Sequence, residues 1–313
     1  MARQKGPITV VGGVNVDICG ASFEPLIEGD SNPGRVTVSL GGVGRNIADN
    51  IARLHSPVRL VTVLGEDSHG LQAEESCEKL GIDMSLSQRI KGETTSTYLC
   101  INDSDGDVRL AIADMDICRH ISPAYLLKRM EEINRSCMVV VDANLSDEAI
   151  ACLCENCTVP IFADPVSVKK AVRLKAQLSK ICCIKPNRPE AEVLTDITIQ
   201  GKNDLEKAAD ILLNRGIQRV CISLGGDGVY FADGQKRGIM PCYPGSILDT
   251  TGCGDAFMAA AACAFSEGAV IEDMARMGLA AAALCAGAIG AIRTDMSRML
   301  LETKLKEVGG ASL

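Results

Sequence analysis

The sequence contains no tryptophan, and aromatic residues make up only 3% of its 313 positions. A protein that binds nucleic acid by stacking many bases on aromatic side chains is therefore not expected. Basic charge is also scarce, because 32 lysines and arginines stand against 40 aspartates and glutamates, for a formal net charge of −8. This balance argues against binding to nucleic acid or an anionic membrane through many phosphate contacts. Any phosphate site must therefore depend on local geometry.

No uncharged run is long enough to span a bilayer. The longest, Met277 to Ile292, falls short of the roughly 20 residues that a spanning helix needs and contains Gly287 and Gly290, so we interpret it as a buried core helix. The N-terminus shows no apolar segment typical of a secretory signal. We expect an intracellular, cytoplasmic protein, with a peroxisomal address at Ala311-Ser312-Leu313 as the alternative.

Cysteine, in contrast, is frequent, with 15 residues. An odd number of cysteines in a long chain without a secretion signal is typical of reduced thiols that pack as small core side chains. The cluster with the most metal-like spacing is Cys152, Cys154 and Cys157. A helix over Glu148 to Asn156 would not direct all three thiols at one ion, so we interpret the cluster as helix packing.

Short β-branched runs alternate with helical patterns along most of the chain. This alternation predicts an α/β fold, with a mostly parallel sheet that carries helices on both faces. No repeat or Pro/Ser-rich linker divides the chain, so we expect one domain over residues 1–313. The predicted strands are Ile8 to Val11, Val58 to Leu64, Met138 to Val141, Val159 to Ala163, Ile181 to Ile184 and Val220 to Leu224, and the predicted helices include Leu71 to Leu80, Ala124 to Asn134 and Asp204 to Arg215.

Two segments, at about 14–40 and 93–113, alternate polar and apolar residues instead. The turn from Asn102 to Asp107 joins two such runs as a hairpin. We expect these segments to form antiparallel strands outside the main sheet. A small β-sheet over the carboxyl edge of a parallel sheet, where ligands bind in open α/β folds, would act as a lid that excludes water.

The strongest chemical signal is the segment Asp249 to Phe257, with glycines at 252 and 254 ahead of an apolar helical run. These glycines let the backbone approach a ligand, and the free N–H groups at the helix start form a site for a phosphoryl group. Asp255 would lie beside that site and could accept the proton of an attacking hydroxyl. For the motif taken alone, we favour the alternative that Asp255 only caps the helix.

A second glycine cluster, Gly41 to Asn46, precedes another helical pattern but lacks the third glycine of a dinucleotide fingerprint, and the chain has no Walker A sequence. Its backbone could instead approach a polyhydroxy ligand, with Asn46 as donor and acceptor. Asn15 and Asp17 follow the first predicted strand and point to the same side, as hydroxyl-binding groups would.

Two further segments follow buried strands. Asn187 and Glu190 could organise hydrated Mg²⁺ beside a nucleotide phosphate. An Asn cap with a Glu capping partner explains the same spacing and is slightly favoured for this motif alone. The turn from Ser223 to Gly228 is rich in small residues, which suits close approach of an adenosine phosphate, although a simple β-turn explains it equally well.

Taken together, these segments resemble the PfkB (ribokinase) family of carbohydrate and nucleoside kinases over essentially the whole chain. Gly41 to Gly70 is similar to the first signature of that family, and Asp249 to Phe257 is similar to its highly specific second signature. Five shorter strings resemble one group of nucleoside kinases within the family. They are Asp30 to Gly34, Gly41 to Asn46, Val141 to Asn144, Asp164 to Ser167 and Lys185 to Arg188.

The resemblance implies a ribokinase-like three-layer sandwich with a β lid, and ATP-dependent phosphorylation of a sugar or nucleoside hydroxyl. It implies that Asp255 is the catalytic base, and that the N–H groups of Gly252, Cys253 and Gly254 stabilise the transferring phosphoryl group. The implied substrate site comprises Asn15, Asp17, Gly42, Asn46 and Asn144 for the sugar, with Ser31, Asn32 and Thr97 toward the base. The implied ATP cleft comprises Asn187, Ser223, Gly225, Gly226, Gly228, Gly252 and Gly254.

Cations are implied as well. Glu190 would hold Mg²⁺ through water, and Asp249 and Thr251 would hold a monovalent cation such as K⁺, near the loop Ala288 to Gly290. Lids in this family often supply dimer contacts, and an exposed sheet edge invites pairing, so we expect a homodimer through the lid. With no tryptophan present, we expect hydrogen bonds to the base edges to carry base recognition.

Cys253 departs from the family pattern, in which an alanine usually separates the two signature glycines. A thiol at a helix N-terminus has its thiolate favoured, which makes it reactive. We therefore expect alkylation of Cys253 to block phosphate binding, and bound ATP to protect the thiol. The alternative is that cysteine simply replaces alanine in the packing.

Overall fold

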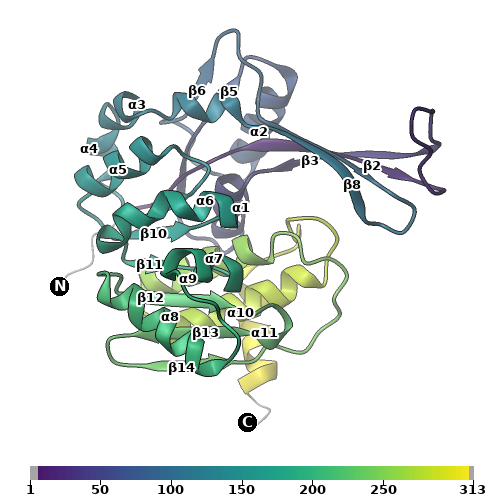
Figure 1. Ribbon diagram of the computed structural model, residues 1–313. Coiled ribbons are helices and arrows are strands. Elements are labelled where there is room, and N and C mark those ends of the chain that lie inside the picture. Colours follow the sequence, from purple (N-terminus) through teal and green to yellow (C-terminus); the bar gives the residue numbers. More distant parts are fainter. Residues whose placement is uncertain (1–5, 310–313) are drawn as a thin grey trace.

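The computed structural model describes residues 6–309, and an eight-stranded sheet in the order β14-β13-β12-β11-β10-β9-β1-β4 forms its centre (Figure 1). The strands from β4 to β12 are parallel, and β13 and β14 add an antiparallel edge. The predicted α/β fold with a mostly parallel sheet is thus confirmed. The strands are β1 Ile8–Val11, β4 Val58–Val61, β9 Met138–Asp142, β10 Ile161–Asp164, β11 Cys183–Ile184, β12 Arg219–Ser223, β13 Val229–Asp233 and β14 Arg237–Met240.

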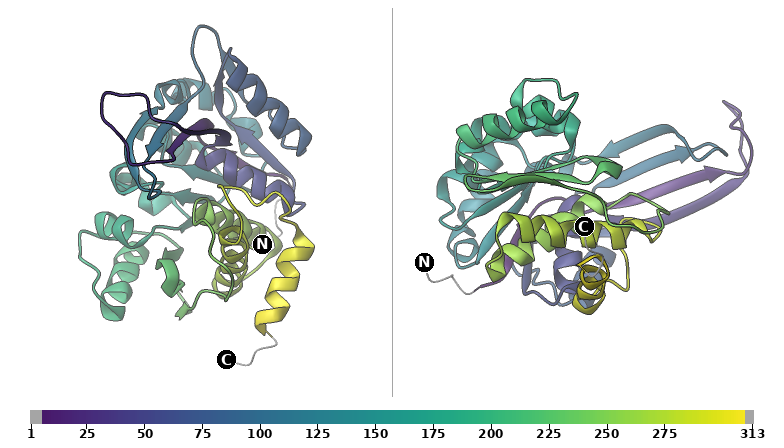
Figure 2. Two further views of the ribbon diagram at one scale, coloured as in Figure 1. Left: turned by 90° about the vertical axis from the view of Figure 1, so that its right-hand side faces the viewer. Right: turned by 90° about the horizontal axis from the view of Figure 1, so that it is seen from below.

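Helices cover both faces of this sheet (Figure 2). One layer consists of α1 Val43–Arg53, α2 Ser68–Lys79, α9 Cys253–Glu267, α10 Ile271–Ala286 and α11 Arg298–Gly309. The other consists of α3 Pro123–Leu127, α4 Met130–Ile133, α5 Asp147–Asn156, α6 Val168–Ala171, α7 Arg188–Thr195 and α8 Lys202–Asn214, with the 3₁₀ segments η1 Asp116–His120 and η2 Val172–Lys180.

The two helical layers enclose two separate apolar cores, one on each face of the sheet. Successive side chains of a strand point to opposite faces, so Val140 of β9 packs in one core while Val139 and Val141 pack in the other. Burial on both faces explains why these strands are nearly continuous apolar runs in the sequence.

A second sheet, the projecting sheet, has the strand order β3-β2-β7-β8 and extends away from the body of the molecule (Figures 1 and 2). It contains β2 Asn15–Ser22, β3 Gly34–Gly41, β7 Thr97–Asn102 and β8 Val108–Asp114. The expectation of a small separate sheet is confirmed. We expected its strands to be antiparallel, and this is wrong for one pair, because β2 and β7 are parallel.

Two predicted elements are divided in the structure. The run Val58 to Leu64 was predicted as one strand, but β4 ends at Val61 and β5 Val63–Gly65 pairs with β6 Gln88–Ile90 in a third sheet. The break falls at Thr62, whose N–H and carbonyl bond the side chains of Ser87 (3.1 Å) and Tyr125 (2.9 Å) instead of the main sheet.

The predicted helix Ala124 to Asn134 likewise divides into α3 and α4. The N–H of Arg129 donates to the carbonyl three residues back, on Leu126 (2.9 Å). The guanidinium of Arg129 lies 3.6 Å from the ring centre of Tyr125 and donates to Leu86 O (2.6 Å). These contacts interrupt the helix between Leu127 and Met130.

The apolar run Met277 to Ile292 lies mostly in α10. No helix within residues 6–309 is long and apolar enough to cross a membrane. Cys152 and Cys154 belong to α5 and pack in the core. Among the residues that the structure describes, no group of three or more His, Cys, Asp or Glu could hold a metal ion by itself. The segment Ala311-Ser312-Leu313 lies outside the described residues.

Candidate active site

The signature turn lies directly before α9. Gly252 is the N-cap residue with a φ of 76°, and a Cβ at this position would lie 1.9 Å from the carbonyl oxygen of Ala291. Both the backbone conformation and the packing therefore require glycine here. Of the three N–H groups predicted to bind a phosphoryl group, that of Cys253 donates a long hydrogen bond to Thr250 O (3.3 Å).

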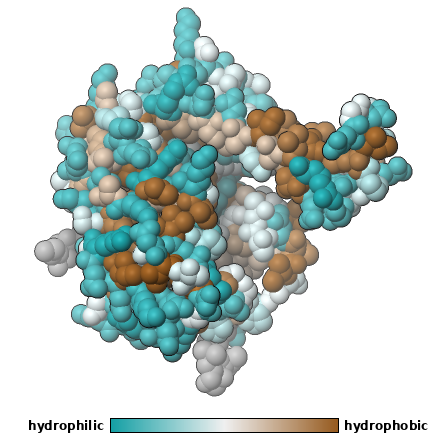
Figure 3. All heavy atoms as spheres, viewed as in Figure 1, coloured by the Kyte–Doolittle hydropathy of each residue, from teal (hydrophilic) through white to brown (hydrophobic). Residues whose placement is uncertain are grey.

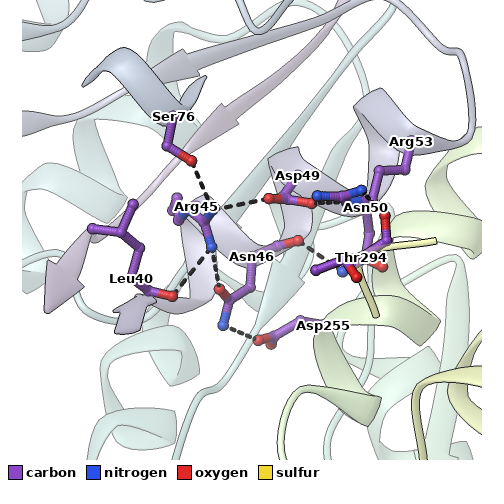
Figure 4. A network of polar contacts seen from close by, with 9 residues as sticks. All are labelled: Leu40, Arg45, Asn46, Asp49, Asn50, Arg53, Ser76, Asp255 and Thr294. Atoms are coloured by element: carbon purple, nitrogen blue, oxygen red, sulfur yellow. Dashed lines mark hydrogen bonds and ion pairs between the residues drawn. The ribbon is translucent and has the colours of Figure 1, made fainter. Parts of the chain in front are cut away.

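Asp255 lies in the first turn of α9, but its carboxylate does not cap the helix, which has no side-chain N-cap hydrogen bond. The carboxylate instead accepts a hydrogen bond from Nδ2 of Asn46 on α1 (2.9 Å; Figure 4). Asp255 is 9% exposed and Asn46 is 5% exposed. The two signatures thus meet at one buried contact, and the helix-capping interpretation of Asp255 is wrong.

The environment of Asp255 suits a general base. Burial raises its pKa to about 8, and the nearby carboxylate of Asp164 adds to this shift. The hydrogen bond from Asn46 and the charge of Lys185 oppose the shift. A base is most effective when its pKa lies near the operating pH, so this carboxyl is better matched to proton transfer than an ordinary aspartate.

Three further ionisable residues of the site were missed in the sequence analysis: Asp142, Asp164 and Lys185. They lie at the carboxyl ends of the neighbouring strands β9, β10 and β11, and all are buried. Lys185 Nζ lies 3.2 Å from Asp164 Oδ2. A charged residue directly after a buried parallel strand is the signal that could have found them, because ligands bind at that edge.

Asp142 is held by the backbone around it. Its carboxylate accepts the N–H groups of Gly13 and Asn144, each at 2.9 Å. Burial raises the pKa of Asp142 to about 6, although these hydrogen bonds oppose the shift. The side chain of Asn144, which was predicted to bind the sugar, accepts a hydrogen bond from Lys170 Nζ (2.5 Å). The sequence analysis did not identify this lysine.

The other predicted sugar residues meet where β2 and β3 leave the body. Asn15 Nδ2 donates to Asp17 Oδ1 (2.5 Å), and a Cβ on Gly41 would lie 2.1 Å from Asp17 Oδ2. Gly42 has a φ of 98°, and its Cβ would lie 2.5 Å from Gly13 O. In the structure these glycines therefore permit close contacts within the chain itself.

A buried network ties this region to α1 (Figure 4). Arg45 Nη1 donates to Leu40 O at the end of β3 (3.2 Å), and Arg45 Nη2 donates to Asp49 Oδ2 (2.9 Å). Arg53 Nε also donates to Asp49, at 2.5 Å. The first turn of α1, which carries Asn46, is thereby fixed to the base of the projecting sheet.

All of the residues predicted to bind ATP except Gly252 line one cavity of about 320 Å³. At Gly225 and Gly226 a Cβ would meet nothing within 4 Å, so this turn borders open space. Gly228 has a φ of 98° and packs against Met240 O. The predicted residues that line the cavity are Asn187, Ser223, Gly225, Gly226, Gly228, Cys253 and Gly254, joined among others by Lys185, Tyr243, Thr250 and Phe257.

Asn187 and Glu190 form a complete capping box at the start of α7. Asn187 Oδ1 accepts the N–H of Glu190, and Glu190 Oε2 accepts the N–H of Asn187, each at 2.9 Å. The capping interpretation is thus confirmed. Burial raises the pKa of Glu190. One carboxylate with few neighbouring oxygens fits Mg²⁺ only if water and phosphate oxygens complete the shell, which is usual for this ion.

The predicted cation residues lie at the other end of the signature turn. Asp249 Oδ1 accepts the N–H of Thr251, and Oδ2 accepts the N–H of Gly290, each at 2.9 Å. Burial would raise the pKa of Asp249, but these hydrogen bonds outweigh it and hold the pKa below its ordinary value. The Asp249 carboxylate thus stays charged between the signature turn and the loop Ala288 to Gly290, which the sequence analysis placed near it.

The residues predicted to contact a base belong to the projecting sheet and the loop between two of its strands. Ser31 and Asn32 are in the exposed loop between β2 and β3, where Asn32 bonds both backbone groups of Ile27. Thr97 pairs with Val16, whereas its neighbour Tyr98 pairs with Asp17. Paired residues of neighbouring strands share a face, so Tyr98 lies on the face of Asp17 and Thr97 on the other.

Cys253 lines the cavity of the predicted ATP residues and is half-buried. Its thiol donates to Ala282 O (3.4 Å), and a hydrogen bond from the thiol of Cys285 lowers the pKa of Cys253. The cysteine therefore lies where a nucleotide phosphate would approach, with its thiolate favoured.

Comparisons with known proteins agree with this geometry. The chain matches the pfkB family carbohydrate kinases over residues 7–298. It is 38% identical to the pseudouridine kinase of Escherichia coli over 85% of this chain and 86% of that protein, and 34% identical to an uncharacterised sugar kinase of the same organism over 87% and 75%. Its structure is similar to that of Arabidopsis thaliana ribokinase complexed with ribose and ATP, with a TM-score of 0.87 and 26% identity over 98% of this chain and 99% of that one. The fold is ribokinase-like, and the chain belongs to the pfkB family of sugar and nucleoside kinases.

Proposed function

We propose that this kinase uses ATP to phosphorylate the 5′-hydroxyl of pseudouridine, with Asp255 as the general base. The observation that carries the chemistry is the placement of Asp255, which is buried, bonded to Asn46 and next to the glycine turn that starts α9. That turn also borders the cavity formed by the predicted ATP residues.

In the proposed reaction, Asp255 accepts the proton of the 5′-hydroxyl as its oxygen attacks the γ-phosphorus of ATP. The helix start at 252–254 offers backbone N–H groups and a positive dipole end to the transferring phosphoryl group. Asn187 and Glu190 would hold hydrated Mg²⁺, which neutralises phosphate charge when bound. Asn15, Asp17, Asn46 and Asn144 would orient the ribose.

The choice of pseudouridine is supported by the similarity to the E. coli pseudouridine kinase and by the five short strings of the nucleoside kinase group, which are those of pseudouridine kinases. With no tryptophan in the chain, base recognition would depend on hydrogen bonds, and pseudouridine differs from uridine by an additional ring N–H. Asp17 and Tyr98 share the face of the projecting sheet that carries the sugar residues, and Tyr98 offers a hydroxyl there.

The projecting sheet would serve as a lid over this site and as the contact of a homodimer. Its other face is apolar: Val36, Val38, Leu99, Leu110 and Ile112 are exposed and occupy alternate positions on three strands. Apolar side chains are concentrated on this projection in the space-filling view (Figure 3). An apolar patch of this kind marks an interaction surface, and a second copy of the chain carries the matching patch.

A coupled ADP-release assay with pseudouridine, uridine, adenosine, ribose and fructose as acceptors tests the proposed substrate. We expect the highest kcat/KM with pseudouridine. A higher kcat/KM with another acceptor would show that this acceptor, and not pseudouridine, is the preferred substrate, while the proposed phosphoryl transfer would stand. No turnover with any of them, together with retained binding of nucleotide or sugar, would favour a sugar-binding relative without catalysis.

A further inference from the structure

Lys185 is a buried cation that the roles above do not use. Its side chain is 8% exposed, and its Nζ lies 3.2 Å from Oδ2 of Asp164, whose side chain is 7% exposed. A buried ion pair costs desolvation energy and is weak evidence for a stabilising role. This pair therefore calls for a functional explanation.

The ammonium group reaches the signature turn. A Cβ placed on Gly254 would lie 3.2 Å from Lys185 Nζ, which is the nearest heavy atom to it. Lys185 and Gly254 both line the ATP cavity, together with Asn187. The cation therefore lies beside Gly254 of the turn that is offered to the phosphoryl group, two residues before Asn187, where α7 begins.

We propose that Lys185 is a further catalytic residue, whose ammonium group contacts the transferring phosphoryl group, and that Asp164 is a positioning residue that holds this ammonium group beside Gly254. The proposal rests on the kinase function above and extends it to a side chain outside both signatures.

The chemistry explains why a cation is useful there. The bond from the 5′-oxygen to phosphorus forms, the bond from phosphorus to the β–γ bridging oxygen breaks, and ADP leaves with that electron pair. Negative charge is spread over the equatorial oxygens in the transition state. A preorganised cation in a site that excludes water stabilises that charge, while the proton of the hydroxyl goes to Asp255 and Lys185 keeps its own.

The surrounding charges keep Lys185 protonated. Burial alone would lower its pKa, but Asp164, Glu190 and Asp255 together raise it. The same neighbours act on the base, because Asp164 and Asp142 raise the pKa of Asp255 whereas Lys185 and the hydrogen bond from Asn46 lower it. Lys185 therefore stays a cation in the pH range in which Asp255 ionises.

The first test compares Lys185→Met, which removes the charge, with Lys185→Arg, which keeps it. Loss of one preorganised donor to a developing charge typically lowers kcat by about 10²–10³-fold, and we expect this loss for Lys185→Met and a smaller loss for Lys185→Arg. The matched control is Lys175→Met, which breaks the surface ion pair between Lys175 and Asp196 (2.6 Å). Activity of Lys185→Met within threefold of the wild type would overturn the proposal.

The second test uses the acid limb of the pH profile of kcat/KM, which reports the ionisation of the base. Lys185→Met should move this limb to higher pH, because a charge that favours ionised Asp255 is lost. Asp164→Asn should move it to lower pH, because a charge that disfavours ionisation is lost. A merely structural role would not shift the limb in opposite directions, so equal or absent shifts would count against the proposal.

The third test needs no acceptor and separates this proposal from the substrate assignment. By calorimetry, Lys185→Met should weaken the non-hydrolysable analogue AMP-PCP at least tenfold while ADP affinity changes less than threefold, since only the analogue has a γ-phosphoryl group. Equal effects on both nucleotides would contradict a contact to that group. An inactive wild type on the acceptor panel would instead refute only the proposed substrates.

Discussion

Asn46 and Asp255 are 209 positions apart in the sequence and meet through a hydrogen bond of 2.9 Å between Nδ2 and Oδ2. The amide donates to the carboxylate and favours its ionised form. This contact joins α1 to α9, so the ionisation of Asp255, the proposed base, depends on the position of α1.

Replacing Asp255 by Asn should abolish turnover, with a loss of about 10³-fold or more, while ligand binding is largely retained. The same change should raise the free energy of unfolding at pH 7–8 by about 1–2 kcal/mol. The raised pKa of Asp255 means that ionising this carboxyl lowers stability as the pH rises from about 4 to about 8, and asparagine removes that loss.

ADP release and thermal unfolding followed by circular dichroism would check both parts of this prediction. The exposed Asp273→Asn is the control and should change neither quantity. Turnover retained by Asp255→Asn would exclude Asp255 as the base.

Asn46→Ala should move the acid limb of the kcat/KM profile to higher pH, because the hydrogen bond that favours the Asp255 carboxylate is lost. We expect kcat/KM at pH 7 to fall about tenfold or more, since a larger share of the base is protonated. A fall in kcat/KM with no shift of the limb would mean that Asn46 contacts substrate without influencing the base.

Mild alkylation should label Cys253 preferentially, because its pKa is lowered by the thiol of Cys285 and it lies at a helix N-terminus that borders the proposed ATP cavity. Peptide mass spectrometry should show that ATP protects it. Cys157 has intermediate exposure and does not line that cavity, so ATP should leave its labelling unchanged. Equal labelling of Cys253 with and without ATP would support the alternative of a simple replacement for alanine.

If Asp249 and Thr251 hold a monovalent cation, turnover should be several-fold higher in potassium than in tetramethylammonium, which is too large for such a site. Asp249→Asn should reduce this activation, because it removes the charge between the turn and the loop at Gly290. Asp295→Asn, on the surface beside Arg293, is the control. Identical rates in both salts would argue against the cation site.

The proposed homodimer can be tested by measuring the mass of the protein in solution by sedimentation. Val38→Glu and Leu110→Glu place charges on the apolar face of the projecting sheet, where both residues are about 60% exposed, and the double variant should sediment as a monomer. Thr37→Glu lies on the opposite face of β3 and should leave the mass unchanged. A monomeric wild type at micromolar concentration would exclude the proposed contact.

Periodicity was sufficient to predict the α/β layers and the separate β-sheet, because these depend on patterns within short stretches of sequence. The break at Thr62 could not be predicted, since the residues whose side chains cause it, Ser87 and Tyr125, are distant in sequence. The capping box at Asn187 and Glu190 could be foreseen because it is local.

The charged centre was missed for the same reason. Asp142, Asp164 and Lys185 each follow a strand, but only the strand order β9-β10-β11 brings them beside one another and beside Asp255. The sequence also could not predict which of the neighbours Thr97 and Tyr98 shares a face with Asp17, because a shift of one residue in the strand register exchanges them.

Arg45 bonds the end of β3 through Leu40 O and bonds α1 through Asp49. One guanidinium therefore connects the end of β3 to the first helix. A displacement of the sheet would reach Asp255 through α1, because Arg45 is next to Asn46, whose amide donates to that carboxylate. If the projecting sheet closes over a substrate as proposed, the same movement would adjust the hydrogen bond to the proposed proton acceptor.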